Sequence, residues 1–138
     1  MSAKKFNRKE IKNYGPKRLI NSVKYASQGI RYAFKREQNM TFQVLISIIV
    51  ILIGLIIGLN RIEWILTLLL MGLVMGAELI NTSIEAMLDV MKPEIDPVVK
   101  IAKDTSAAAV LLFCIMSGII GVLIFTPNIV SYIEKITS

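Results

Sequence analysis

Three long apolar runs, separated by short polar segments, dominate this chain. The first run ends at Leu59, the second begins at Trp64, and the third ends at Phe125, just before Thr126-Pro127. A helix of about 20 residues crosses the hydrocarbon core of a bilayer, and a proline breaks a helix. Counting from these points predicts an all-α integral membrane protein, a single membrane domain over 1–138, with membrane helices over 40–59, 64–91 and 98–125.

A shorter periodic pattern precedes the first run. After Gly15-Pro16, apolar residues recur every three or four positions and basic residues fill positions between them; the apolar stripe is Leu19, Val23, Ala26, Ile30 and Ala33. This spacing predicts an N-terminal amphipathic helix over 15–36 that lies on the membrane surface. Residues 1–14 are basic and polar, and we interpret them as a cytoplasmic arm.

The distribution of charge favours a membrane location over nucleic-acid binding. The net charge is +6, but 11 of the 16 Lys and Arg residues precede Glu37, ahead of the first apolar run. The positive-inside rule then predicts a multi-pass protein of the plasma membrane with its N-terminus in the cytoplasm and its C-terminus outside. No nucleic-acid partner is expected. The chain has no histidine, which excludes histidine-based catalysis and metal sites.

One polar stripe interrupts the second apolar run. Glu78, Asn81, Glu85 and Asp89 fall within about 80° of one another at 100° per residue. Glu78 lies about six residues, or about 9 Å, inside the membrane surface expected near Ile84, where an ionisable group indicates function. The alternative is a stripe that only joins helices through hydrogen bonds. Because three helices shield such groups incompletely, we expect a second copy of the chain to cover Glu78 and Asn81.

Counting along the three spans places further charged residues at one depth. Glu37, Glu85 and the pair Lys103-Asp104 all fall at the cytoplasmic mouth, whereas the outer halves of the spans carry no charge. Carboxylates at this level suit a hard divalent cation such as Mg²⁺, and a lysine suits a phosphate. From these residues alone two hypotheses stay open: a metal-dependent phosphoryl transferase, and a proton-coupled transporter that uses Glu78.

The second span also resembles a family signature. It reads Glu78-Leu-Ile-Asn81-Thr82-Ser-Ile84-Glu85 and is followed by Lys103-Asp104 and Ala107-Ala108-Ala109-Val110. This is similar to the prokaryotic membrane diacylglycerol kinase family, whose signature is E-x-x-N-[ST]-x-I-E followed by a K-D pair, and the resemblance covers about residues 15–126. The family consists of three-span helical proteins with a surface helix, which form homotrimers with active sites between protomers. The resemblance therefore implies a lipid kinase that transfers the γ-phosphate of MgATP to a lipid hydroxyl.

The resemblance also implies a role for individual residues. Glu78 would be the catalytic base, with Asn81 beside it in the catalytic centre, and Glu37 and Glu85 would be the Mg²⁺ ligands. The residues expected to contact ATP are Arg18, Tyr25, Glu37, Glu85, Lys103 and Asp104. The residues expected near the lipid are Arg31, Phe34 and Trp64.

Two subgroups share this signature, one acting on diacylglycerol and one on undecaprenol, the polyprenol carrier of cell-wall synthesis. The basic arm and the context Lys35-Arg36-Glu37-Gln38-Asn39 resemble the undecaprenol kinases. Undecaprenol is therefore the preferred substrate, and diacylglycerol is the alternative. One departure concerns the lipid side: the family often has Phe three residues after the first glutamate, where this chain has Met40 and places its aromatic residue at Phe42.

Overall fold

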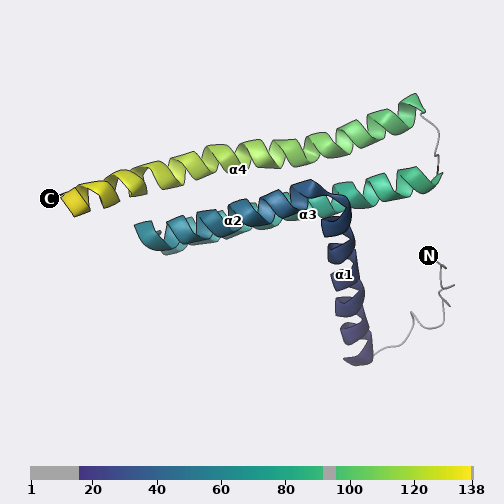
Figure 1. Cartoon of the computed structure of the whole chain (residues 1–138), viewed down its shortest axis with the longest axis horizontal. Helices are drawn as coiled ribbons and strands as arrows, with labels where there is room; N and C mark the ends of the chain where they lie inside the picture. Colours follow the sequence, from purple (N-terminus) through teal and green to yellow (C-terminus); the bar gives the residue numbers. More distant parts are fainter. Residues whose placement is uncertain (1–15, 92–95, 138) are drawn as a thin grey trace.

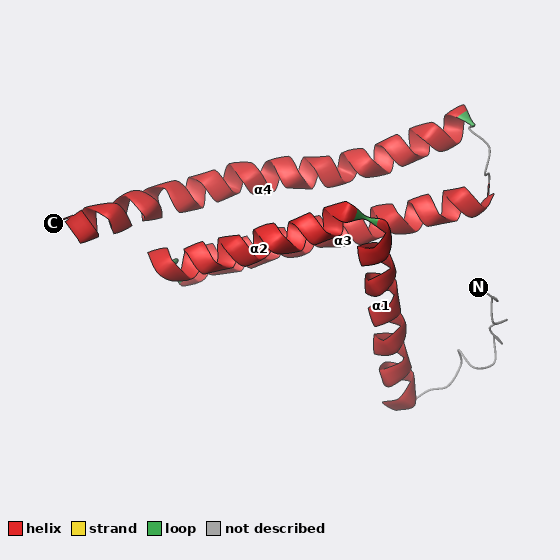
Figure 2. Cartoon of the chain, in the orientation of Figure 1, coloured by secondary structure: helices red, strands yellow, loops and turns green. Residues whose placement is uncertain are grey.

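The computed structural model describes residues 16–91 and 96–137, so the predicted arm over 1–14 lies outside the described residues. The described residues form four helices, which Figures 1 and 2 draw in two colourings. Three helices lie side by side, while the first runs crosswise to them (Figure 1). Their bounds are α1 Pro16–Arg36, α2 Gln38–Ile57, α3 Arg61–Met91 and α4 Pro97–Thr137.

The three helices that lie side by side, α2, α3 and α4, are long and apolar enough to cross a membrane, as the three apolar runs predict. Large apolar side chains such as Leu52, Leu69 and Leu123 are exposed, and few are buried in the described chain. A helix that is apolar on all sides suits a lipid environment. The chain is therefore a membrane protein whose apolar faces point outward, away from the narrow contacts between helices.

A glycine ends α2 in a tight turn. Gly58 has φ 76°, a left-handed backbone conformation that favours glycine. The backbone N–H groups of Gly58 and Leu59 both donate to the carbonyl of Gly54, over 3.1 and 3.2 Å. Leu59 is buried. This turn reverses the chain within three residues and places α3 against α2.

A capping box then starts α3 earlier than the sequence predicts. The Asn60 side-chain Oδ1 accepts from the backbone N–H groups of Ile62 and Glu63, over 2.9 and 3.1 Å. The Glu63 carboxylate accepts in return from the backbone N–H of Asn60 over 2.8 Å. These bonds satisfy free N–H groups at the helix start. Residues 61–63, which precede the helix predicted to begin at Trp64, therefore form the first turn of α3.

Helix α4 continues past Phe125, its predicted end, to Thr137, and Pro127 lies inside it. Proline removes a backbone donor, but membrane helices tolerate it where other groups re-satisfy the backbone. The Asn128 side-chain amide donates to the carbonyl of Ile124 over 2.8 Å and to the Glu63 carboxylate over 2.9 Å. Asn128 thus supports the helix beside the proline and ties α4 to the start of α3.

Candidate active site

The most deeply buried large side chain of the described chain is a carboxylate. Glu78, on α3, is 1% exposed. Its Oε2 accepts a hydrogen bond of 3.3 Å from the Gln43 side-chain Nε2 on α2, and its Oε1 is buried without a partner among the described residues. Burying a carboxylate with one neutral donor is costly. Glu78 therefore has the surroundings of a functional group within a membrane span.

The sequence predicts that a second copy of the chain is needed to bury Glu78 and Asn81. This prediction is wrong, because a single chain already buries both side chains. Glu78 is 1% exposed and Asn81 is 6% exposed within a single chain. The physical reason is that α3 packs its polar stripe against α2 and α4 at once, so the stripe lies between three helices and away from the lipid side. Shielding from lipid therefore gives no argument for an oligomer.

Asn81 links α3 to α4 and orients a second carboxylate. Its side-chain Nδ2 donates to Glu85 Oε1 over 3.1 Å, and its Oδ1 accepts from the Ser106 hydroxyl over 2.6 Å. An ionised carboxylate only accepts hydrogen bonds, so Glu85 takes the amide nitrogen of Asn81 and leaves the amide oxygen for the Ser106 hydroxyl, which also lies 2.9 Å from the Lys103 carbonyl. Asn81 in turn presents its donor to Glu85.

Glu37 brings a third carboxylate to the same region from the junction of α1 and α2. Burial raises the pKa of Glu37, and the negative charge of Glu85 raises it further; Arg36 opposes this, and Glu78 adds to it. The ion pair of Arg36 Nε with Glu37 Oε1 is long, at 3.5 Å. The predicted metal ligands Glu37 and Glu85 are therefore near enough to repel each other, and the pairing of Arg36 with Glu37 offsets this only in part.

A divalent cation fits this excess of negative charge. Glu37 and Glu85 offer carboxylate oxygens, the ligands that Mg²⁺ prefers, and Mg²⁺ usually takes one or two carboxylates together with phosphate and water. Among residues 16–91 and 96–137, no group of three or more His, Cys, Asp or Glu side chains is placed to hold a metal.

An ion-pair junction lies beside these carboxylates. Asp89 on α3 binds Arg36, at the end of α1, and Lys103, near the start of α4. The hydrogen bond to Asp89 raises the pKa of Arg36 above its usual value. Lys103 is 34% exposed at its side chain. The junction connects three helices and leaves a cation partly open beside Glu37 and Glu85.

The other predicted contact residues are not gathered into this cluster. Asp104 is exposed and pairs with Lys100 over 3.1 Å. Helix α1 runs away from the other helices (Figure 1), and it carries Arg18, Tyr25, Arg31 and Phe34 on exposed positions.

The remaining predicted lipid residue, Trp64, belongs to the opposite end of α3. It contacts the position of Gly54 on α2, where an added Cβ would meet the Trp64 ring at 3.0 Å. Fourteen residues separate Trp64 from Glu78, which is about 21 Å along a helix. Met40, which stands where the resembled family often has Phe, is buried, whereas the nearby aromatic residue Phe42 is exposed.

Three residues of the site were not predicted from the sequence. Gln43 and Ser106 are polar residues within or beside apolar runs. That polarity is the feature of the sequence that could have indicated them. Their contacts with Glu78 and Asn81 depend on how α2 and α4 rotate against α3. The sequence places Arg36 next to Glu37, whereas its close partner in the structure is Asp89, 53 residues along the chain.

Most of this amino-acid sequence matches a family of known proteins. The family model described as prokaryotic diacylglycerol kinase matches residues 24–125, a range that includes α2, α3, most of α1 and α4 as far as Phe125. The chain belongs to the prokaryotic diacylglycerol kinase family. The matched range contains every residue of the cluster described above: Glu37, Gln43, Glu78, Asn81, Glu85, Asp89, Lys103 and Ser106.

Two curated relatives span most of the chain. The undecaprenol kinase of Bacillus subtilis (strain 168) is 37% identical over 112 residues, covering 81% of this chain and 91% of the relative. The diacylglycerol kinase of Haemophilus influenzae (strain ATCC 51907 / DSM 11121 / KW20 / Rd) is 34% identical over 116 residues, covering 83% of this chain and 98% of the relative. Among solved structures, none matches the chain significantly.

Proposed function

We propose that this protein is a membrane lipid kinase that transfers the γ-phosphate of ATP to the hydroxyl of a lipid alcohol, with undecaprenol as the preferred acceptor. The observation that carries the proposal is Glu78, whose Oε1 is buried within a membrane span and has no partner among the described residues. A soluble substrate does not need a base at that depth. A lipid alcohol, which approaches from within the bilayer, does.

In the proposed reaction Glu78 acts as the general base. The lipid hydroxyl oxygen attacks the γ-phosphorus of ATP, a new phosphorus–oxygen bond forms, and the bond to the bridging oxygen of ADP breaks. The hydroxyl proton passes to Glu78 Oε1, while ADP leaves with the electron pair of the broken bond. Positioned proton transfer of this kind contributes about 10²- to 10⁴-fold to a rate.

Glu37 and Glu85 would hold Mg²⁺ on the phosphates. The ion, when bound, would supply positive charge that offsets the negative charge of the phosphates. Glu78 and Glu85 are seven residues apart, about 10.5 Å along a helix, so the two carboxylates serve different atoms. Asn81 holds Glu85 through its 3.1 Å hydrogen bond and so belongs to the catalytic centre.

Lys103 and Asp104, at the start of α4, would contact ATP, and Arg18 and Tyr25 on α1 would complete that site in a neighbouring protomer. A homotrimer with composite sites is supported by the position of α1, which runs away from its own bundle (Figure 1). Arg31, Phe34 and Trp64 are proposed to contact lipid. In this arrangement α1 lies on the cytoplasmic surface of the plasma membrane, with the N-terminus inside and the C-terminus outside.

The preference for undecaprenol rests on the Bacillus subtilis relative, an undecaprenol kinase at 37% identity. Diacylglycerol is the second candidate because the Haemophilus influenzae relative is a diacylglycerol kinase at 34% identity. Both alcohols carry one hydroxyl on an apolar molecule, so Glu78 could accept the hydroxyl proton from either of them.

A phosphotransfer assay with the full chain in lipid bicelles separates these candidates. Radiolabelled MgATP is offered with undecaprenol, with diacylglycerol, or with neither, and lipid phosphate is measured. We expect lipid phosphate only when an alcohol is present, with the higher kcat/KM for undecaprenol. A higher kcat/KM for diacylglycerol would reverse the substrate preference, and ATP hydrolysis without lipid phosphate would contradict the kinase.

A further inference from the structure

Side-chain hydrogen bonds join α3 to α4 at three levels of the described chain. From the end of α4 to its start, the pairs are Glu63–Asn128, Asn81–Ser106 and Asp89–Lys103. The middle pair adjoins a proposed metal ligand, because Asn81 also donates to Glu85 Oε1 over 3.1 Å. Ser106 thus lies two hydrogen bonds from a carboxylate that would hold Mg²⁺.

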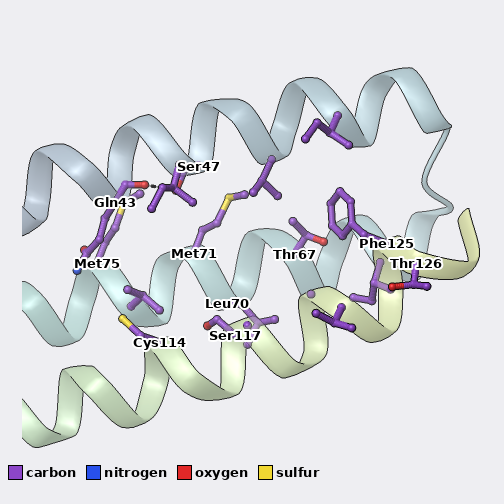
Figure 3. A pocket seen from close by; sticks show the side chains of 18 of the residues that line it. Gln43, Ser47, Thr67, Leu70, Met71, Met75, Cys114, Ser117, Phe125 and Thr126 are labelled. Carbon is purple, nitrogen blue, oxygen red and sulfur yellow. Dashed lines mark hydrogen bonds between the residues drawn. The ribbon is translucent and has the colours of Figure 1, made fainter. Parts of the chain in front are cut away.

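The bundle is loosely packed above this pair. A cavity of about 570 Å³ separates α2, α3 and α4 over part of their length (Figure 3). The hydroxyls of Thr67 and Ser117 line it, and both are buried without a hydrogen-bond partner among the described residues. Side chains on opposite walls of a cavity lack contacts with one another. The lining ends on α3 at Met75, about 9 Å before Asn81 along a helix. The position of α4 against this part of α3 therefore depends more on the polar contacts that follow, and the bond between Asn81 and Ser106 is the nearest.

The hydroxyl of Ser106 has one hydrogen and two acceptors within reach. Asn81 Oδ1 lies at 2.6 Å and the Lys103 carbonyl at 2.9 Å. The Lys103 carbonyl lies inside α4, where the backbone N–H four residues later is its regular donor. Asn81 is buried, and Ser106 is the donor to its Oδ1 among the described residues. Because a buried amide oxygen without a donor is costly, the hydrogen of Ser106 goes to Asn81.

The effect of this bond reaches Glu85. The amide of Asn81 is planar, so a donor that holds its oxygen also sets the direction of its nitrogen, which donates to Glu85. Without the serine hydroxyl, the amide would keep only its bond to Glu85 and would turn together with that carboxylate. Lys103 and Ser106 are one turn apart on α4, so the helix that presents the lysine also holds the amide.

We infer that Ser106 is a positioning residue for the metal site: it holds Asn81, and Asn81 holds Glu85 toward the cation. This inference rests on the proposed kinase function and adds a residue of α4 to its metal site. Groups that orient a metal ligand change metal affinity by about 10- to 100-fold. Because Ser106 acts through a second residue, its effect belongs at the lower end of that range.

Metal affinity tests this role without catalysis. The full chain in lipid bicelles is titrated with Mn²⁺ in the presence of a non-hydrolysable ATP analogue, and free Mn²⁺ is followed by electron paramagnetic resonance. We expect Ser106→Ala to weaken Mn²⁺ binding about tenfold with an unchanged Tm, because alanine favours a helix. Thr105→Ala is the matched control on the same helix: the Thr105 hydroxyl is exposed and donates to the Ile101 carbonyl over 2.7 Å. This control should bind Mn²⁺ like wild type.

Two further variants separate positioning from a general effect on structure. Ser106→Thr keeps the hydroxyl and should bind Mn²⁺ with an affinity close to that of wild type. In Asn81→Ala, the additional change Ser106→Ala should weaken Mn²⁺ binding no further, because the serine acts through the amide.

Three results would overturn the inference. They are equal Mn²⁺ affinity in Ser106→Ala and wild type, a loss in Ser106→Thr as large as in Ser106→Ala, and additive losses in the double variant. A fall in Tm that accompanies the loss of affinity in Ser106→Ala would also overturn it, since Ser106 would then serve only the fold. Wild-type phosphotransfer, measured in parallel, reports separately on the kinase function.

Discussion

Asn81 donates to Glu85 over 3.1 Å while accepting from Ser106 over 2.6 Å, so one amide connects a proposed metal ligand to the neighbouring helix. Groups that orient a metal ligand affect metal affinity or activity by about 10- to 100-fold. Among the described residues, this amide is the hydrogen-bond donor to the carboxylate of Glu85. The relationship leads directly to a test of the metal site.

We expect Asn81→Ala to raise the Mg²⁺ concentration needed for half-maximal phosphotransfer by about 10- to 100-fold. The loss follows because Glu85 would no longer be held toward the metal. Magnesium titrations of activity measure it, and Ser83→Ala, an exposed change on the same helix whose hydroxyl bonds only to the Leu79 carbonyl, is the control. An unchanged Mg²⁺ requirement in Asn81→Ala would mean that Asn81 does not act through Glu85.

Glu37 gives a prediction about pH and stability. Its pKa is raised above the ordinary value of 4.5, first by burial and then by the charge of Glu85, so the folded protein holds this proton more tightly than the unfolded chain. The contribution of Glu37 to stability therefore falls as pH rises from 4.5 through the raised pKa. Over that window, thermal unfolding without Mg²⁺ should show a steeper loss of stability in wild type than in Glu37→Gln.

The same variant separates repulsion from metal binding. At neutral pH without Mg²⁺, Glu37→Gln should be at least as stable as wild type, because it removes one of the carboxylates that repel each other. Added Mg²⁺ with a non-hydrolysable ATP analogue should stabilise wild type more than the variant, and the variant should lose phosphotransfer. Full activity of Glu37→Gln at low Mg²⁺ would show that Glu37 is not a metal ligand.

The junction at Asp89 predicts a split between stability and nucleotide binding. Asp89→Asn removes the partner of Arg36 and Lys103; because these groups are partly exposed, the loss of stability should be small. Lys103→Met should instead raise KM for MgATP while changing stability little. Unfolding in detergent and KM measurements test both. If Lys103→Met leaves KM for MgATP unchanged, Lys103 serves only the junction.

The polar stripe on α3 could be predicted because its spacing is fixed by one helix. Glu78, Asn81 and Glu85 repeat at three and four residues, so they share a face whatever the neighbouring helices do. The partners of that stripe could not be predicted. Gln43 and Ser106 meet it only because α2 and α4 pack with a particular rotation, and that rotation depends on many weak contacts between apolar side chains.

The helix ends show the same limit. The reversal after Leu59 follows from Gly58 and Asn60, which are local signals for a helix end and a helix start. Helix α4 continues through Pro127, and beside the proline Asn128 bonds to the Ile124 carbonyl and to Glu63, a residue 65 positions away. A rule that ends a helix at proline does not include such distant contacts, so the sequence predicts an end at Phe125 that the structure does not have.

The central claim is that Glu78 takes the proton of a lipid alcohol, and the Glu78→Gln variant tests it most directly. The amide keeps the size of the side chain but cannot accept a proton, so MgATP binding should stay within about twofold while phosphotransfer to undecaprenol falls by about 10²- to 10⁴-fold. Both are measured on the same bicelle preparation, with Ser83→Ala as the control. Retained phosphotransfer in Glu78→Gln would contradict the account.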